Sequence, residues 1–189
     1  MSEIPVQPER ERAMNYLEAT RAQFIEMTAG RTPAQWRFKP AGGERWSLGE
    51  LAEHLAVTER GVLLSIRRSL SGPSATAEEK AATSGRDERL LRGLPDRSRK
   101  VLAPEAVRPM GRFAGLAQTV EEFKARREET MRLLETTEND LLREHVLPHP
   151  VLGPLDVYQW VLFLAAHCDR HLQQMKEVTA DPDFPAELP

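Results

Sequence analysis

Residues 160–175, with the sequence WVLFLAAHCDRHLQQM, decide the fold of this chain because they combine a long apolar run with two histidines four positions apart. The apolar positions and both histidines, His167 and His171, recur at helical spacing on one stripe. Asp156 and Gln159, just before this run, have the spacing of a capping box at a helix start. The sequence therefore predicts a helix that begins at Asp156 and places both histidines on its buried face.

Three further stretches have the apolar periodicity of amphipathic helices, at about residues 8–29, 47–70 and 119–137. The second begins with its own capping box, formed by Ser47 and Glu50. The apolar stripes are Ala13, Leu17, Thr20, Phe24 and Met27 in the first, Leu48, Leu51, Leu55, Thr58, Val62 and Ile66 in the second, and Val120, Phe123, Thr130, Leu134 and Leu141 in the third. Four such stripes predict an all-α four-helix bundle, and we see no alternation typical of strands.

The connection between the second and third helices, residues 71–118, is too long for a tight turn. Its first half is small, polar and charged, and its second half contains several prolines. A connection of this length can return along the bundle, so that the two helices it joins run parallel. We therefore expect an up-down-down-up bundle with a long crossover. It forms one domain over residues 1–189, with its core at about residues 8–178 and a proline-rich tail at 179–189.

The composition is that of an ordinary globular protein. Hydrophobic residues make up 40% of the 189 residues and charged residues 29%. The net charge of −3 gives no basic excess that would indicate nucleic acid as a partner. No apolar run reaches the ~18 residues of a membrane span, and the amino terminus has no apolar signal core. Cys168 is the single cysteine, so an internal disulfide is excluded. From these absences we expect a cytoplasmic protein without membrane or nucleic-acid partners.

A third histidine, His54, lies on or beside the apolar stripe of the second helix. With a rise of about 1.5 Å per residue, His54 is roughly 10 Å past the start of its helix, and His167 and His171 are about 10–17 Å before the end of theirs. The three histidines thus reach one level if these helices run antiparallel. One core histidine alone is usually just hydrogen-bonded, but three neutral imidazoles together indicate a divalent metal with open positions for water or substrate. Imidazole ligands suit zinc, nickel, copper or iron.

A second histidine pair has the same four-residue spacing but a different context. His145 and His149 lie next to prolines, and Pro148 and Pro150 flank His149 directly. Proline interrupts a helix, so this spacing does not place the two side chains on one helical face. We predict that both are loop residues and exclude them from the metal site.

Three segments carry a resemblance to a known family: WSLGELAEHLAVTERG (residues 46–61), LAQTVEEFKARREE (116–129) and HPVLGPLDVYQWVLFLAAHCDRHLQQM (149–175). They resemble the DinB/YfiT-like superfamily, over about residues 9–178 in total. The resemblance implies a four-helix bundle whose divalent metal, most often nickel or zinc, is bound by His54, His167 and His171. Relatives include S-transferases and isomerases that use low-molecular-weight thiols, and metal-dependent hydrolases, and the resemblance does not choose among them.

Several residues near the three histidines are candidates for supporting roles. Glu50 lies one turn before His54, although its spacing from Ser47 favours a capping role. Glu53 adjoins His54 in sequence but points elsewhere on the helix. Gln174, three positions after His171, shares its face and is a candidate hydrogen-bond partner, or simply a polar residue near a helix end.

The aromatic residues before the second helix are candidates for the wall of the site. Trp36, Phe38 and Trp46 lie in or next to the connection that should cover the histidines. They form either an apolar mouth for a small organic ligand or a cap on the bundle core. For Trp46 the cap is the favoured interpretation.

Two classes of function remain open. The first is a metal-dependent thiol S-transferase or hydrolase that acts on a small molecule, with a low-molecular-weight thiol as co-substrate in the transferase case. The second is a non-catalytic metal- or ligand-binding bundle, such as a stress-response protein. No residue beyond the metal ligands is assigned a catalytic role. The resemblance, together with Leu63, Leu64 and Phe163 outside the main stripes, also predicts a homodimer.

Overall fold

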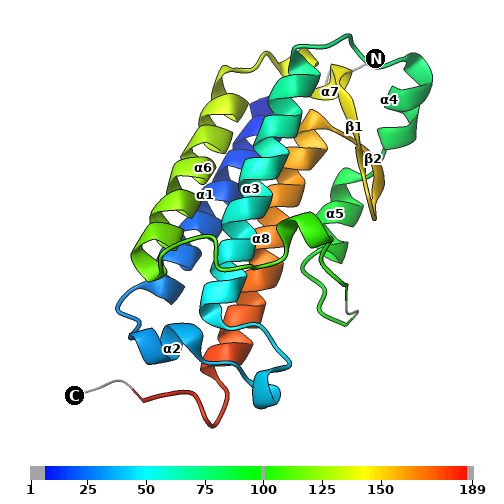
Figure 1. The fold of residues 1–189 in the computed structure, drawn as a ribbon. Coiled ribbons are helices and arrows are strands. Elements are labelled where there is room, and N and C mark those ends of the chain that lie inside the picture. The colour runs from blue at the N-terminus through cyan, green and yellow to red at the C-terminus, as the bar shows by residue number, and fades with distance from the viewer. Residues whose placement is uncertain (1–6, 99–100, 187–189) are drawn as a thin grey trace.

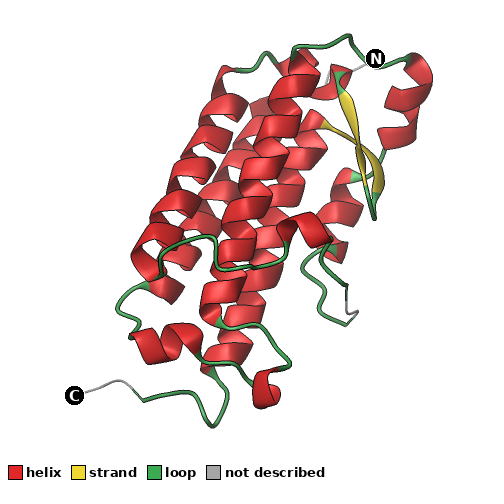
Figure 2. Ribbon diagram, in the orientation of Figure 1, coloured by secondary structure: helices red, strands yellow, loops and turns green. Residues whose placement is uncertain are grey.

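Four long helices, side by side, make up most of the computed structural model, which describes residues 7–98 and 101–186 (Figures 1 and 2). They are α1 (Gln7–Thr28), α3 (Leu48–Leu70), α6 (Leu116–Thr136) and α8 (Val157–Thr179). Each lies within three residues of its expected bounds, so the prediction of four helices is confirmed. Residues 1–6 and 187–189, at the ends of the predicted domain and tail, and residues 99–100 of the predicted crossover lie outside the described residues.

The helices follow the predicted up-down-down-up order. In Figure 1, α3 and α6 run in one direction and pack against each other, whereas α1 and α8 run in the opposite direction. The parallel pair, α3 and α6, is joined by the long crossover, as expected. Since α3 and α8 are antiparallel neighbours, their histidines can meet at one level of the bundle.

Both predicted capping boxes are present, and they fix where the histidine-bearing helices begin. The Ser47 hydroxyl accepts from the Glu50 amide at 3.2 Å, and the Glu50 carboxylate accepts from the Ser47 amide at 2.9 Å. Asp156 and Gln159 make the same reciprocal pair at 2.7 and 3.3 Å. Because each box satisfies two otherwise unpaired amides, it sets the first turn and thereby the position of every later residue along the helix.

Shorter helices fill the connections. They are α2 (Pro33–Arg37), η1 (Ala41–Gly43), α4 (Ala77–Thr83), α5 (Asp87–Gly93), η2 (Glu105–Val107) and α7 (Asn139–Glu144). The assignment of Leu141 to the buried face of the third long helix is wrong. The backbone of Thr137 is extended and ends α6, and Leu141 then lies on the exposed side of α7, where Leu142 is buried instead. Among the described residues, no helix combines the length and hydropathy that a membrane span requires.

A small antiparallel hairpin precedes α8 and corrects the expectation of no strands (Figure 2). It consists of β1 (Val146–His149) and β2 (Gly153–Asp156), with Pro148 opposite Pro154. Proline cannot donate to a ladder and is tolerated in such edge strands, which is why this segment shows no strand-like alternation in the sequence. The hairpin leads directly into α8, and the Val157 amide donates to the His145 carbonyl at 3.1 Å.

A fully buried ion pair connects all four long helices. The Arg127 guanidinium of α6 binds the Glu59 carboxylate of α3 with two nitrogens, at 2.9 and 3.0 Å. It also donates to the Leu17 carbonyl and the Thr20 hydroxyl of α1, and to the Leu164 carbonyl of α8. Because every charged atom of the pair is hydrogen-bonded, the desolvation cost of burying it is offset. The pair holds the four helices at one mutual level.

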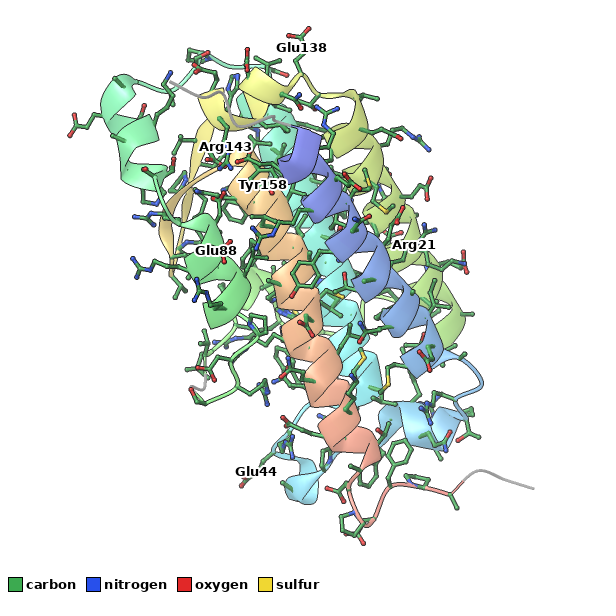
Figure 3. All side chains as sticks on the ribbon, turned by 180° about the vertical axis from the view of Figure 1, so that it is seen from behind. Arg21, Glu44, Glu88, Glu138, Arg143 and Tyr158 are labelled. Atoms are coloured by element: carbon green, nitrogen blue, oxygen red, sulfur yellow. The ribbon has the colours of Figure 1, made fainter. Side chains whose placement is uncertain are left out.

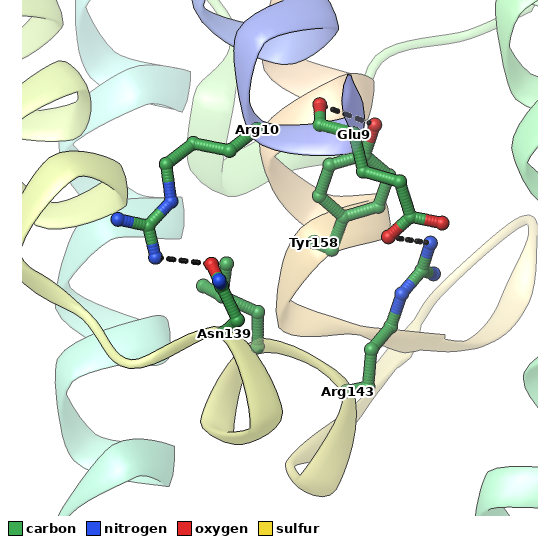
Figure 4. Close-up of a pocket in the computed structure, with 6 residues that line it drawn as sticks. Glu9, Arg10, Asn139, Arg143 and Tyr158 are labelled. Carbon is green, nitrogen blue, oxygen red and sulfur yellow. Dashed lines mark hydrogen bonds and ion pairs between the residues drawn. The ribbon is translucent and has the colours of Figure 1, made fainter. Parts of the chain in front are cut away.

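A second polar cluster closes one end of the bundle, and a small pocket lies within it (Figure 4). The Tyr158 hydroxyl donates to the Glu9 carbonyl at 2.9 Å, and Arg143 pairs with the Glu9 carboxylate at 3.0 Å. Arg143 also pairs with Asp87 of α5 and Asp156 at the start of α8. In Figure 3, Arg143 and Tyr158 lie at one end of the bundle and Glu44 at the other. This cluster therefore ties the crossover to α7 and α8, far from the loop that contains Glu44.

The residues that suggested a homodimer have different positions. Leu63 and Phe163 are buried in the core of the single chain, and only Leu64, with 52% of its surface exposed, is available to a partner. Two of the three apolar residues behind that expectation are therefore explained by the bundle itself. The homodimer stays a prediction.

Candidate metal centre

His54, His167 and His171 converge between α3 and α8. The Nε2 atom of His167 lies 3.2 Å from Nε2 of His54 and 3.1 Å from Nε2 of His171. One ring nitrogen from each residue falls within 4.8 Å of the other two. The predicted convergence of the three imidazoles at one helical level is therefore confirmed.

Two of the three imidazoles are held in a defined tautomer by carbonyl oxygens. The Nδ1–H group of His54 donates to the Val107 backbone carbonyl of η2 at 2.7 Å. The Nδ1–H group of His171 donates to the side-chain carbonyl of Gln174, one turn later on α8. A carbonyl can only accept, so Nδ1 carries the proton in both rings and Nε2 keeps a free lone pair. Gln174 thus has the partner role that its spacing allowed, and it turns Nε2 of His171 toward the cluster.

The donor set fits a divalent metal ion. Ligand nitrogens about 2.0–2.1 Å from one ion are roughly 2.8–3.4 Å apart at octahedral to tetrahedral angles, a range that includes the two spacings around His167. The Nε2 lone pairs of His54 and His171 both point toward Nε2 of His167, and a cation among the three nitrogens would relieve the repulsion between them. Hydrogen bonds from the outer ring nitrogens to carbonyls are also the usual support of metal-binding histidines. These three residues could therefore hold a divalent metal.

Burial keeps the cluster uncharged. It lowers the pKa of His54, and the hydrogen bond to Val107 opposes this effect only in part. Burial, followed by the neighbouring His171 and His54, lowers the pKa of His167 well below its usual value. The pKa of His171 is likewise well below its usual value, because of burial and then His54. All three imidazoles are therefore neutral near pH 7, which is the state that binds metals.

Two aromatic rings flank the imidazoles. Trp46, directly before the cap residue of α3, has its ring 5.0 Å from that of His54 and stacks on His171 at 6.3 Å. Phe163 stacks on His167 at 5.1 Å from one turn earlier on α8. His54 and His171 are buried, whereas His167 is partly exposed.

The three candidate wall residues separate in the structure. Trp46 packs against the core, in agreement with its favoured interpretation, and its ring also lies beside His54 and His171. Trp36 is buried against α3, where a Cβ on Gly49 would lie only 2.7 Å from its indole nitrogen. Phe38 packs edge-on against Phe184 of the carboxy-terminal tail. Trp36 and Phe38 thus cover the end of the bundle core, and Trp46 is the candidate that borders the histidines.

The carboxylates nearest the histidines in sequence all have other partners. Glu50 completes its capping box and pairs with Lys39 at 2.8 Å, which confirms the capping interpretation. Asp169 accepts from the Tyr16 hydroxyl at 2.9 Å. Glu53 is buried and binds the backbone of residues 110–112. Burial raises the pKa of Glu53, but these hydrogen bonds outweigh it and leave the pKa below its usual value.

The excluded side chains lie outside the cluster, as expected. The prediction that His149 is a loop residue is wrong, because it is the last residue of β1, paired with Gly153. Its Nδ1 accepts from the Val151 and Leu152 amides at 3.1 Å. His145 is buried near the start of the hairpin. Cys168 faces the core next to α1, and burial raises the pKa of its thiol to about 11, so it has no nucleophilic character at neutral pH.

Three contacts around the histidines are absent from the sequence prediction. Phe163 lies four residues before His167 and so shares its face, a signal that helical spacing contains. The carbonyl of Val107 has no such signal, because any residue has one. The contacts of Glu53 depend on a loop whose path the sequence does not reveal.

These features define a class of protein, an up-down-down-up four-helix bundle with three clustered histidines between antiparallel helices. The chain belongs to the DinB superfamily, whose sequence model matches residues 16–175. It is 34% identical over 167 residues to YuaE, an uncharacterized protein of Bacillus subtilis (strain 168). The matched residues cover 87% of this chain and 96% of YuaE. Its fold is similar to that of YfiT from Bacillus subtilis, with a TM-score of 0.64 at 14% identity, over 95% of this chain and 90% of YfiT. YfiT is described as a probable metal-dependent hydrolase with an unusual four-helix bundle topology.

Proposed function

We propose that this protein is a metal-dependent enzyme in which His54, His167 and His171 bind one divalent ion, nickel or zinc. The observation that carries the proposal is the convergence of three neutral imidazoles with their Nε2 atoms turned inward. A divalent ion with three such ligands lowers the pKa of a bound water or thiol toward neutrality and so supplies a nucleophile. The likeness to YfiT favours hydrolysis.

The residues around the cluster suggest what the substrate is. Trp46 and Phe163 border the histidines with apolar rings, which suits a small organic molecule. The partial exposure of His167 marks the side on which such a molecule would enter.

Transfer of a low-molecular-weight thiol to a small electrophile is the second candidate reaction. Glu50, Glu53 and Asp169 are each engaged in hydrogen bonds elsewhere, so none is free to act as general base. A thiol needs less help from a base than water does, because its own pKa is closer to neutrality.

The test measures the metal content of the purified protein and then its activity with zinc or nickel restored. Ester and amide substrates test hydrolysis, and an electrophile together with a low-molecular-weight thiol tests transfer. The proposal expects one ion per chain and one of the two activities. His167→Ala should lose the ion and the activity, and His149→Ala should keep them. A protein that holds no divalent ion would overturn it.

A further inference from the structure

A segment of the crossover covers the histidine face of the bundle. Residues 105–112, which we call the strap, consist of η2 and the five residues after it, and they cross the face of α3 and α8 in Figure 1. Two consecutive residues of α3, Glu53 and His54, bind the strap. The His54 ring donates to the Val107 carbonyl at 2.7 Å, and Glu53 binds the strap near its other end.

The contact of Glu53 is unusually complete. Its carboxylate accepts from the backbone amides of Met110 at 2.8 Å, Gly111 at 2.8 Å and Arg112 at 3.2 Å, and from the Arg112 guanidinium at 3.0 Å. Outside a helix start, a residue in the left-handed conformation helps successive amides to point at one anion, and Gly111 provides this with a φ of +74°. Such charge-assisted hydrogen bonds in a buried setting are strong.

The strap transmits this contact to the metal ligand. The Arg112 guanidinium, held by Glu53, also donates to the Arg108 carbonyl at 2.6 Å and the Ala106 carbonyl at 3.4 Å. Val107 lies between these two carbonyls, so its own carbonyl is held where His54 needs an acceptor. Glu53 therefore reaches His54 through the strap and the Val107 carbonyl.

We propose that Glu53 is a positioning residue for the metal centre, because it holds the strap whose Val107 carbonyl fixes the tautomer and orientation of His54. This inference rests on the proposed function, since it concerns one of the three ligands. Partners of ligating histidines typically contribute 10–100-fold to metal affinity. Because Glu53 acts through the strap, we expect about a 10-fold loss of affinity without it.

The experiment compares Glu53→Gln with Glu50→Gln in the full chain. The first variant keeps the size of the side chain but loses the charge that binds three amides and Arg112. The second removes the same charge one turn away, where glutamine still completes a capping box. The dissociation constants for zinc and cobalt are measured by competition with a chelator. Long-range proton–nitrogen spectra of the metal-free protein report which ring nitrogen of His54 carries the proton, because a bound ion at Nε2 would itself fix the proton on Nδ1.

The expected result is about 10-fold weaker metal binding and a mixed His54 tautomer in Glu53→Gln, with both properties unchanged in Glu50→Gln. If the wild type binds metal and Glu53→Gln binds it equally well with the same tautomer, this inference is wrong and the proposed function stands. A wild type that binds no metal would overturn the proposed function itself. If Glu53→Gln does not fold, the variant Gly111→Pro tests the inference instead. Proline removes the Gly111 amide and cannot adopt its positive φ, so the strap is disrupted while the sequence of α3 is unchanged. Weaker binding by that variant supports the role of the strap, and unchanged binding rejects it.

Discussion

The chain contains the spacing His-x-x-x-His twice, and only one of the two copies brings its histidines together. In α8, His167 and His171 share one helical face, and their Nε2 atoms are 3.1 Å apart. In the segment before β2, His145 and His149 are separated by an extended strand, and His149 uses its Nδ1 to accept two backbone amides of the hairpin turn. Four-residue spacing therefore places two histidines side by side where the backbone is helical, and not in this extended segment.

The environments of the two pairs differ as well. The α8 pair meets a third histidine from an antiparallel helix, and each outer nitrogen that bonds a carbonyl leaves Nε2 free for the cluster. The hairpin pair meets aromatic rings, with His149 against Trp160 and Phe163. The α8 pair thus has the arrangement of metal ligands, whereas His149 of the other pair stabilises the hairpin turn.

The largest effect should come from removing a histidine of the α8 pair. His171→Ala should weaken metal binding by more than about 100-fold, since even outer partners of a ligand contribute 10–100-fold. The bundle should stay folded, because one truncated side chain costs only a few kcal/mol. Chelator competition measures the affinity, and circular dichroism measures the fold. His149→Ala is the control and should bind metal as the wild type does, and equal losses in the two variants would contradict the comparison.

The next effect concerns the ion pair that aligns the helices bearing the histidines. Arg127→Met leaves Glu59 buried without its partner and should lower the free energy of unfolding by about 3–5 kcal/mol. The double variant Glu59→Leu with Arg127→Met should recover much of this loss, because no unpaired charge remains. Urea denaturation of the three proteins gives the answer. A loss below about 1 kcal/mol in Arg127→Met would show that the pair is not needed.

A smaller effect is expected at the outer partner of His171. Gln174→Leu removes the carbonyl that holds Nδ1–H and should weaken metal binding by about 10-fold, without loss of stoichiometry. Gln173→Leu, one position away, is the matched control. Titration with cobalt, followed by its visible absorption, measures both. Affinity unchanged within twofold would mean that Gln174 does not orient His171.

The smallest effect should separate the hairpin pair from the cluster by pH. Burial lowers the pKa of His149 to about 4, from an unfolded value near 6.5. The unfolded chain therefore takes up the proton first, so this contribution to stability is present above about pH 6.5 and is lost as the pH falls toward 4. Since the ring is partly exposed, we expect only about 1 kcal/mol.

His149→Asn provides the comparison, because its side-chain carbonyl can still accept the two amides but does not titrate. Urea denaturation at pH 7, 5.5 and 4, in the presence of a chelator, should show the wild type losing more stability than the variant. Parallel pH dependences of the two proteins would show that protonation of His149 does not matter.

Much of the bundle could be predicted because its signals are local. The capping boxes at Ser47 and Asp156 set where two helices begin, and the helical rise then places His54, His167 and His171 at one level. The length of the crossover implied the helix directions. These inferences need only spacing and chain length, which the sequence contains directly.

The remainder depends on contacts between distant segments. The hairpin pairs Pro148 with Pro154, so its sequence lacks the alternation of a strand. The Val107 carbonyl has no side-chain signature. The sequence did not decide which of the candidate aromatic rings borders the histidines, because this depends on the path of the connecting loop. Arg127 did have a signal, since a charge on an apolar stripe indicates a buried partner.

The central claim is that three histidines from two antiparallel helices form a metal site, and X-ray absorption of the zinc- or nickel-loaded protein tests it most directly. The predicted result is one ion per chain with three imidazole nitrogens at about 2.0–2.1 Å for zinc, and no retained ion in His167→Ala. Absence of a retained ion, or a shell with fewer than three imidazoles in the wild type, would contradict the account.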